Sequence, residues 1–441
     1  MNLNLIRIFV LPMVFSSFLF SQSTGKISLE TAIAEGLKKD GNYLNAVLDE
    51  ERADLQWRLA AKNKLFRLGF DGNYLYRSET MVIEFAPTPI PGGGLIPGRE
   101  IEAGLNHNFD LKLGLTQPLF TGGILANSVR QAEVDKTVQA NQKFLMENEI
   151  SGLIKSSYFQ YLFLVRRQES FNTLKKTLDL HLRRIENLLD EGLARKSDLL
   201  ETLSQVEEVQ LNIKDTEQAV ESERIHFRKL CGFNPEEIDD TYREKPASQD
   251  EAVAYFKEHH PVLKNLQNQV EMISLQKKIT AGKYLPQVSG FAELHYGKPG
   301  IDYFAKKWSL YFQGGIVVTI PVFDWNRLRG EKAIQDLQQQ KIVNQRNQFV
   351  REITASLENL YSVLQKLEEK RGHVMQLIAY SEEDAGLKEA LYAERQIPNV
   401  DYLTALLARE KNALAAEELR IQIEKTRVGI NTLIGKNKEG V

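Results

Sequence analysis

The sequence lacks most features that mark metal sites, disulfide scaffolds and nucleic-acid-binding proteins. Its 441 residues contain one cysteine, Cys231, so the chain has no disulfide framework and no cysteine near its start for lipidation. Six methionines provide no ladder of soft metal ligands. The formal net charge is −3, and lysine and arginine are spread along the chain rather than gathered in a basic stripe. We therefore expect no nucleic-acid partner.

Catalytic and cofactor-binding patterns are also missing. His259 and His260 precede Pro261 without acidic or cysteine partners at ligand spacing, so no metal site is predicted there. Cys231, beside a glycine at a helix end, is interpreted as a packed small apolar residue rather than a nucleophile. The glycine-rich stretch APTPIPGGGLIPG, residues 86–98, has no lysine-serine pair after it and is interpreted as an exposed hairpin loop. We expect no enzyme activity and assign no catalytic, cofactor-binding or metal-binding residues.

Long apolar runs occur only at the start. Arg7 is followed by the apolar run Ile8 to Phe20 and then by the polar residues SQSTG, which is the pattern of a secretory signal peptide at residues 1–21. Beyond it, no apolar run approaches the ~20 residues that a spanning helix needs. If the chain crosses a membrane, we expect it to do so by strands.

Two strand patterns stand out because one copies the other. FDLKLGLTQPLFTGG, residues 109–123, and FQGGIVVTIPVFDWN, residues 312–326, both alternate apolar with polar or small residues. Period-2 alternation indicates a strand whose two faces meet different solvents. Because proline lacks a backbone donor, we expect pairing to stop at Pro118 and Pro321. The residues after each proline then form a turn from strand to helix, with Phe120, Gly123 and Phe323 in these turns.

Very long helical patterns follow both strands. No proline occurs between Pro118 and Pro235, and the helical pattern at about 122–190 would extend roughly 100 Å at 1.5 Å per residue. A helix of that length needs coiled-coil partners. A break at EGLARKSD, residues 191–198, leads into a second helix at about 197–231. Ahead of the first strand, Ser28 to Leu65 is a further helical pattern.

The whole arrangement occurs twice. An offset of 203 pairs Pro118 with Pro321 and Tyr158 with Tyr361, and an offset of 220 pairs positions before the hairpins, so the first hairpin loop is seventeen residues longer than the second. We expect a signal peptide at 1–21, a first repeat at 22–232, an equatorial linker at 233–247, a second repeat at 248–435 and a tail at 436–441. Strands are expected at about 67–78, 105–118, 287–297 and 308–321, and the second repeat's helices at about 325–392 and 398–434.

Closure of the strands dictates the expected architecture. Lipid-exposed sheet edges are not tolerated, and four strands cannot close a barrel that needs at least about eight. Several chains must therefore pool their strands. The predicted fold is mainly α, with long antiparallel coiled-coil helices and a small transmembrane β part. In such a barrel Leu113 and Val318 would face lipid, whereas Lys112 and Thr319 would face the lumen.

These residues carry a family resemblance. SLETAIAEGL, KYLPQVSGFAELHYG, TQPLFTGG with TIPVFDWNRLRG, and SDLLETL with VDYLTAL resemble the outer-membrane efflux protein family, the TolC-like channel-tunnels, over essentially the full mature length. The resemblance implies a homotrimer that shares a twelve-stranded barrel in bacterial outer-membrane lipid and a helical tunnel in the periplasm. It also implies a passive exit duct for a tripartite efflux or type I secretion system, with a periplasmic adaptor and an inner-membrane pump as partners.

The resemblance also implies roles for the helix turns. The turn at Gly192, Leu193 and Ala194 matches the adaptor-docking tip of the family, although a glycine C-cap followed by a packing leucine is an equally good interpretation. A gate is implied around residues of the two returning helices and the second turn, namely Asp198, Tyr392, Arg395, Asp401 and Thr404.

The sequence departs from the family at this gate. Thr404 stands where the family can carry a second acidic residue, and Arg395 lies two positions before the expected basic site, which is Ile397. Asp198 and Asp401 are also ordinary acidic residues for a helix's first turn.

A second functional class stays open, namely a periplasmic coiled-coil scaffold or adaptor without a pore. The strands distinguish the two, because an adaptor does not need hairpins with one uniformly apolar face. The sequence identifies neither the cargo nor the pump.

Overall fold

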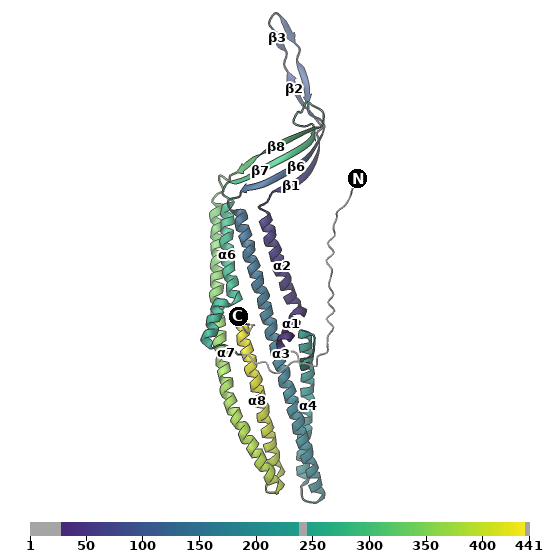
Figure 1. Ribbon diagram of the computed structural model, residues 1–441, viewed down its shortest axis with the longest axis vertical. Helices are drawn as coiled ribbons and strands as arrows, with labels where there is room; N and C mark the ends of the chain where they lie inside the picture. Colours follow the sequence, from purple (N-terminus) through teal and green to yellow (C-terminus); the bar gives the residue numbers. More distant parts are fainter. Residues whose placement is uncertain (1–27, 238–244, 437–441) are drawn as a thin grey trace.

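The computed structural model describes residues 28–237 and 245–436, and the chain is an elongated molecule with a β-sheet at one end and long helices running away from it (Figure 1). The expected signal peptide, part of the expected linker and residues 437–441 of the expected tail lie outside the described residues. The first half contains α1 (Leu29–Lys39), α2 (Gly41–Lys62), β1 (Arg67–Tyr76), β6 (His107–Phe120), α3 (Ile124–Asp190) and α4 (Lys196–Cys231). The second contains α5 (Gln249–His259), α6 (Pro261–Gly282), β7 (Gln287–Lys298), β8 (Ser309–Thr319), α7 (Arg327–Ala393) and α8 (Asn399–Leu433).

Corresponding helices of the two halves have the same length, except that α4 has 36 residues and α8 has 35. Helices α1 and α5 both have 11 residues, α2 and α6 both have 22, and α3 and α7 both have 67. Their starts are separated by the same offsets that align the sequence, 220 before the sheet and 203 after it. The buried cores correspond as well, since Ile154 and Phe227 in one are matched by Leu357 and Ile430 in the other.

The helical stretch before the sheet differs from the sequence prediction. A single helix was expected from Ser28 to Leu65, but the chain bends at Asp40, whose backbone is extended. The Asp40 carboxylate accepts hydrogen bonds from the amides of Asn42 and Tyr43, both at 2.9 Å, and so begins a new helix. The prediction missed this break because helical periodicity continues across it while one side chain caps the backbone locally.

The four long strands form one antiparallel sheet in the order β1-β6-β7-β8. Residues directly opposite share a face, and the register places Leu113 opposite Phe70 on β1 and Leu294 on β7, which in turn lies opposite Phe312 on β8. One face is therefore apolar across all four strands, and its large side chains are exposed in the single chain. Lys112 and Thr319 lie on the other face, so the register agrees with the face assignment made from alternation.

One strand end was predicted incorrectly. Strand β6 does not stop at Pro118 but continues to Phe120, because its ladder with β7 passes the proline through a bulge between Pro118 and Phe120. The ladder with β1 on the other side ends at Thr116, before the proline. At Pro321 the expectation is met, since β8 ends at Thr319.

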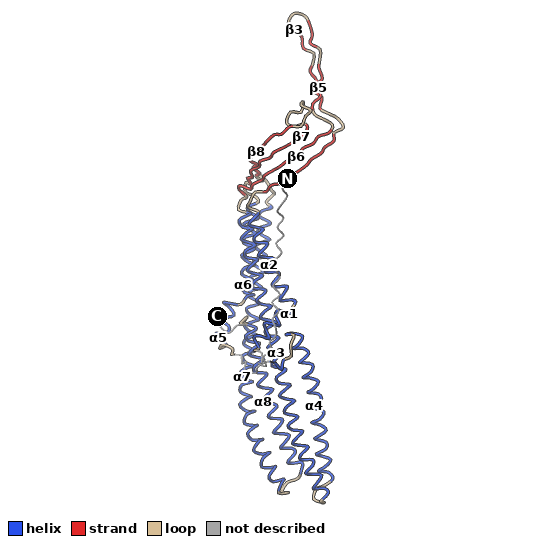
Figure 2. Tube along the Cα trace, turned by 45° about the vertical axis from the view of Figure 1, so that its right-hand side comes forward, coloured by secondary structure: helices blue, strands red, loops and turns tan. Residues whose placement is uncertain are grey.

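The glycine-rich hairpin loop is more ordered than expected. Four short strands form a narrow ribbon there, β2 with β5 and β3 with β4, and the ribbon projects beyond the sheet on the side away from the helices (Figure 2). The four strands are β2 (Met81–Phe85), β3 (Thr88–Ile90), β4 (Gly94–Ile96) and β5 (Arg99–Ala103). The sequence analysis did not predict this ribbon because prolines and glycines interrupt the alternation of apolar and polar residues.

Within the described residues, none of the helices combines the length and apolar character required to cross a membrane.

Candidate functional site at the helical tips

The turn between α3 and α4 presents a leucine at the apex of the molecule. Gly192 has φ +72°, the left-handed conformation that glycine adopts without steric cost. The amides of Gly192 and Leu193 donate to the carbonyls of Leu189 and Leu188 at 2.9 and 2.7 Å, which closes the end of α3. Leu193 is nonetheless 49% exposed. The glycine therefore caps the helix, and the leucine remains accessible to a partner.

The corresponding turn between α7 and α8 is different. Arg395 occupies the position of Gly192 and has φ +62°, a conformation that costs a residue with a β-carbon roughly 1–2 kcal/mol. Gln396 stands where the first turn has Leu193, and its amide donates to the Leu391 carbonyl at 2.8 Å. The second turn is thus strained and polar at its apex.

Three of the five expected gate residues meet in one pocket between the two turns. Asp198, Tyr392 and Arg395 line a pocket of about 400 Å³, together with Leu193 and Ala194 of the first turn. The Asp198 carboxylate accepts a hydrogen bond from the Arg195 amide at 3.0 Å, so it also caps α4. Burial raises the pKa of the Tyr392 hydroxyl, and the nearby Asp198 carboxylate raises it further.

The other two expected gate residues lie apart from this pocket. Asp401 is an exposed residue in the first turn of α8, and the pocket's lining includes neither it nor Thr404. The Thr404 hydroxyl donates to the Val400 carbonyl at 2.7 Å. Ile397, at the site where the family resemblance led us to expect a basic residue, packs against an apolar cluster.

A buried polar group behind the pocket was missed by the sequence analysis. The amide of Asn399, a residue only 2% exposed, donates to the Thr202 hydroxyl and the Asp198 carbonyl, both at 3.2 Å. Its side-chain oxygen lies 2.6 Å from Nε2 of His181, so this nitrogen carries the proton. Burial lowers the pKa of His181, which therefore stays neutral at pH 7. These contacts join α3 and α4 to the start of α8.

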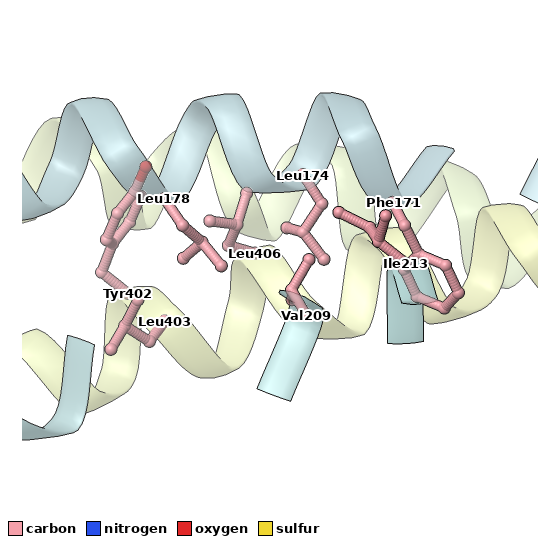
Figure 3. Close-up of a cluster of buried hydrophobic side chains, with 8 residues drawn as sticks. All are labelled: Phe171, Leu174, Leu178, Val209, Ile213, Tyr402, Leu403 and Leu406. Atoms are coloured by element: carbon pink, nitrogen blue, oxygen red, sulfur yellow. The ribbon is translucent and has the colours of Figure 1, made fainter. Parts of the chain in front are cut away.

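Aromatic rings extend this junction. The His181 ring centroid lies 5.1 Å from that of Tyr392 and 4.7 Å from that of Tyr402, and the two tyrosines stack at 5.4 Å. The Arg184 guanidinium lies 5.6 Å from the Tyr392 ring centroid. Next to the rings, a buried apolar cluster continues along α3, α4 and α8 (Figure 3), with Phe171, Leu174, Leu178, Val209, Ile213, Leu403 and Leu406. The two helical hairpins of one chain are thus held together near their tips.

The junctions between sheet and helices also differ between the halves. Gly122 and Gly123 are both left-handed, and a β-carbon on Gly122 would lie 2.4 Å from the Gly282 carbonyl oxygen, so only glycine fits against α6. In the second half Trp325 and Asn326 adopt this left-handed conformation. Trp325 is 86% exposed.

Aromatic side chains gather at both ends of the apolar sheet face. Beside the helices, the rings of Phe323 and Trp325 lie 4.8 Å apart. At the far end, Tyr296 stacks on Trp308 at 4.9 Å, and further rings of β1 and β6 join this group, namely Tyr74, Tyr76 and Phe109. An apolar band flanked by two aromatic girdles is typical of transmembrane β-barrels.

Comparisons with known proteins agree with these observations. Residues 256–436 match the family model described as Outer membrane efflux protein, which confirms the resemblance found in the sequence motifs. A search of curated protein sequences finds no match.

Among solved structures, the fold is similar to the outer membrane protein VceC of Vibrio cholerae, with a TM-score of 0.72 at 15% identity over 92% of this chain and 96% of that one. It is also similar to the CmeC outer membrane channel of Campylobacter jejuni, with a TM-score of 0.69 at 12% identity over 93% of this chain and 87% of that one. The MtrE outer membrane channel of Neisseria gonorrhoeae gives a TM-score of 0.70 at 14% identity over 93% and 89%. The fold class expected from the sequence is thereby confirmed.

Proposed function

We propose, from the outer membrane efflux protein match of the second half and the channel fold of the whole chain, that this protein is a passive exit duct in the bacterial outer membrane. Three copies would share a barrel of twelve strands, and their long helices would continue it as a tunnel in the periplasm. A periplasmic adaptor and an inner-membrane pump of a tripartite efflux or type I secretion system would deliver the cargo.

The sheet carries this proposal. Its strands β1 and β8 are open edges, and its apolar face leaves residues such as Phe70, Phe312 and Ile316 more than three-fifths exposed. In water such a face and such edges would promote association. In lipid the face is satisfied, and closure with further copies satisfies the edges.

The opposite face suits a water-filled lumen. The Lys112 ammonium lies 3.3 Å from Glu293 and 3.7 Å from Asp71, and the Gln313 amide donates to Glu293 at 2.7 Å. The His295 ring lies 3.0 Å from the Asp110 carboxylate. Charged and polar groups linked across all four strands are consistent with an aqueous interior. A periplasmic scaffold without a pore, the alternative function, gives no reason for a sheet with one charged and one exposed apolar face.

The tip pocket would act as the gate. Asp198, Tyr392 and Arg395 surround the space between the two turns of each chain, and the His181–Asn399 hydrogen bond fixes the hairpins behind them. Opening would separate these turns in a two-state equilibrium. Asp401, exposed on α8, would instead face the pore axis with its two copies and attract cations there.

Docking of the adaptor would use the first turn. Gly192, Leu193 and Ala194 form an apex with an exposed apolar side chain, whereas the second turn places Arg395 and Gln396 at the equivalent positions. In a trimer, three turns with an exposed leucine would alternate with three polar turns, and an adaptor could bind this surface with threefold symmetry.

Conductance in planar lipid bilayers tests this function. The wild-type protein should give small steps, and Asp198→Ala combined with Tyr392→Phe should give larger ones because the pocket loses a carboxylate and a hydroxyl. Glu191→Ala serves as the control, since Glu191 is an exposed turn residue outside the pocket lining. Absence of any conductance from correctly folded protein would refute the pore, and unchanged steps in the double variant would refute the gate.

A further inference from the structure

The two halves of one chain meet along a seam that shows what a second copy would contact. We call it the internal seam, and it places α3 of the first half against α6 and α8 of the second. At the start of α6, the Asn141 amide donates to the Asn265 side-chain oxygen at 2.7 Å. Further down, Leu174 and Leu406 belong to one buried cluster, and near the tip His181 bonds to Asn399.

Each helix of this seam has a counterpart on an outer flank of the chain. The counterpart of α3 is α7, 203 positions on, and the counterparts of α6 and α8 are α2 and α4, 220 and 203 positions back. Translating the three contacts by these offsets gives the pairs Asn344 with Asn45, Leu377 with Leu203, and Asp384 with Lys196. All six residues are exposed in the single chain.

We propose that these residues form the seam between subunits, with α7 of one copy packed against α2 and α4 of the next. The proposal rests on the oligomeric duct proposed above and assigns its interface residue by residue. Each translated pair is chemically matched: two amides that can hydrogen-bond, two leucines, and an acid with a base. The amide pair and the acid–base pair were not used to find the offsets, which come from other positions.

The same translation applied to the sheet also gives a matched pair. Leu113 lies opposite Leu294 where β6 meets β7. The same offsets place Ile316 of β8 opposite Tyr74 of β1 in the next copy, and both side chains are exposed and apolar. The open edges of one chain thus continue into each other in the register of the internal pair.

The two seams differ at the tip, and this difference gives the subunit seam a regulatory role. Inside a chain the tip is joined by a buried hydrogen bond between neutral groups, which salt does not screen. Between chains the same place holds Asp384, which also pairs with Lys388 at 3.1 Å, and Lys196 on an exposed turn. Exposed ion pairs are weak and are screened by salt. The contact between subunits at the tip is therefore weaker and more sensitive to salt than the contact inside each chain, and its loss would favour the open tip.

Cysteine cross-linking of the full-length protein in mild detergent tests the seam. Cys231 is fully buried, and burial raises the pKa of its thiol to about 12, so the native chain supplies an unreactive background. Asn45→Cys with Asn344→Cys, treated with a short bifunctional thiol reagent, should give covalent trimers on denaturing gels. Asn141→Cys with Asn265→Cys should give only internally linked monomers. Asn45→Cys with Arg346→Cys, which moves one thiol about 200° around α7, should lose the trimer band.

The outcomes separate this inference from the duct itself. Trimers by mass without cross-linking of the Asn45 and Asn344 variants would overturn the seam and leave the duct standing, whereas monomers by mass would overturn both. For the tip, Asp384→Lys should raise single-channel conductance by opposing Lys196, and adding Lys196→Glu should reverse the rise. A double variant that conducts like the single one would overturn the ion pair.

Discussion

Replacing Leu113 by arginine should destabilise the protein strongly in lipid, because this residue lies at the centre of the apolar face. Strand β6 has 14 residues and Leu113 is the seventh, so about 20 Å of strand precedes it and about 24 Å follows it at ~3.4 Å per residue. Tilted by about 40°, the strand would span the apolar band of ~25 Å with Leu113 close to its middle. Arginine at the midplane of a barrel costs about 2–4 kcal/mol, or a factor of roughly 30 to 1,000 in the folding equilibrium.

A control residue at the same depth in the membrane distinguishes the effect of the sheet face from the effect of depth. Gln313 lies on the polar face opposite Glu293, which in turn lies opposite Gly114, the neighbour of Leu113. An arginine at Gln313 keeps a partner, since Glu293 is 2.7 Å from the present amide. Urea unfolding of the protein in phosphatidylcholine vesicles should therefore show a large loss for Leu113→Arg and less than about 1 kcal/mol for Gln313→Arg. Equal losses would show that the register does not separate lipid from lumen.

Three further changes should have distinct signatures. Asn399→Leu should destabilise the tip by about 2–3 kcal/mol, because His181 loses its buried partner. Hydrogen exchange should become faster only at the helix ends near the tip, and unchanged protection there would contradict the role of this junction. Asp401→Ala should weaken block by divalent cations added on the helical side, and an unaltered block in planar bilayers would place the cation site elsewhere. His260 accepts the Val262 amide at 3.2 Å as the cap of α6, and burial lowers its pKa from 6.5 to about 4. As the pH falls, the His260 imidazole is protonated first in the unfolded chain, so its contribution to the free energy of unfolding is present above pH 6.5 and is lost toward pH 4. His260→Asn should keep the cap and remove this pH dependence of unfolding. An equal loss of stability toward pH 4 in the variant would refute the assignment.

The sequence predicted the features that repeat and missed those that depend on one side chain. Alternation around Leu113 places the apolar face correctly, because a period of two survives any detail of packing. The break at Asp40 escaped notice because a capping side chain acts over two residues and leaves the helical periodicity intact. Pro118 was taken as a strand end because a bulge cannot be read from composition.

At the helical tips, too, some of the residues that lie together were predicted and others were missed. Asp198 and Tyr392 were grouped by the family resemblance, and the structure does place them around one pocket, although their role in gating stays a prediction. His181 and Asn399 were not found, since they lie 218 positions apart and the repeat offset pairs His181 with Asp384 instead. The repeat offset identifies equivalent positions in the two halves, and it does not show which residues of one half contact the other.

The equal lengths of α3 and α7 restrict how this chain can change in evolution. Inserting one residue into either helix would move its tip by about 1.5 Å and rotate every later side chain by about 100° around the axis. In the proposed trimer, six such helices in a ring would have to finish in one plane to meet a common partner, so an insertion in one half would be tolerated only with a matching insertion in the other. The hairpin loops are under no such restriction, and there the two halves have diverged in length. Length drift is thus confined to the end of the molecule farthest from the tips.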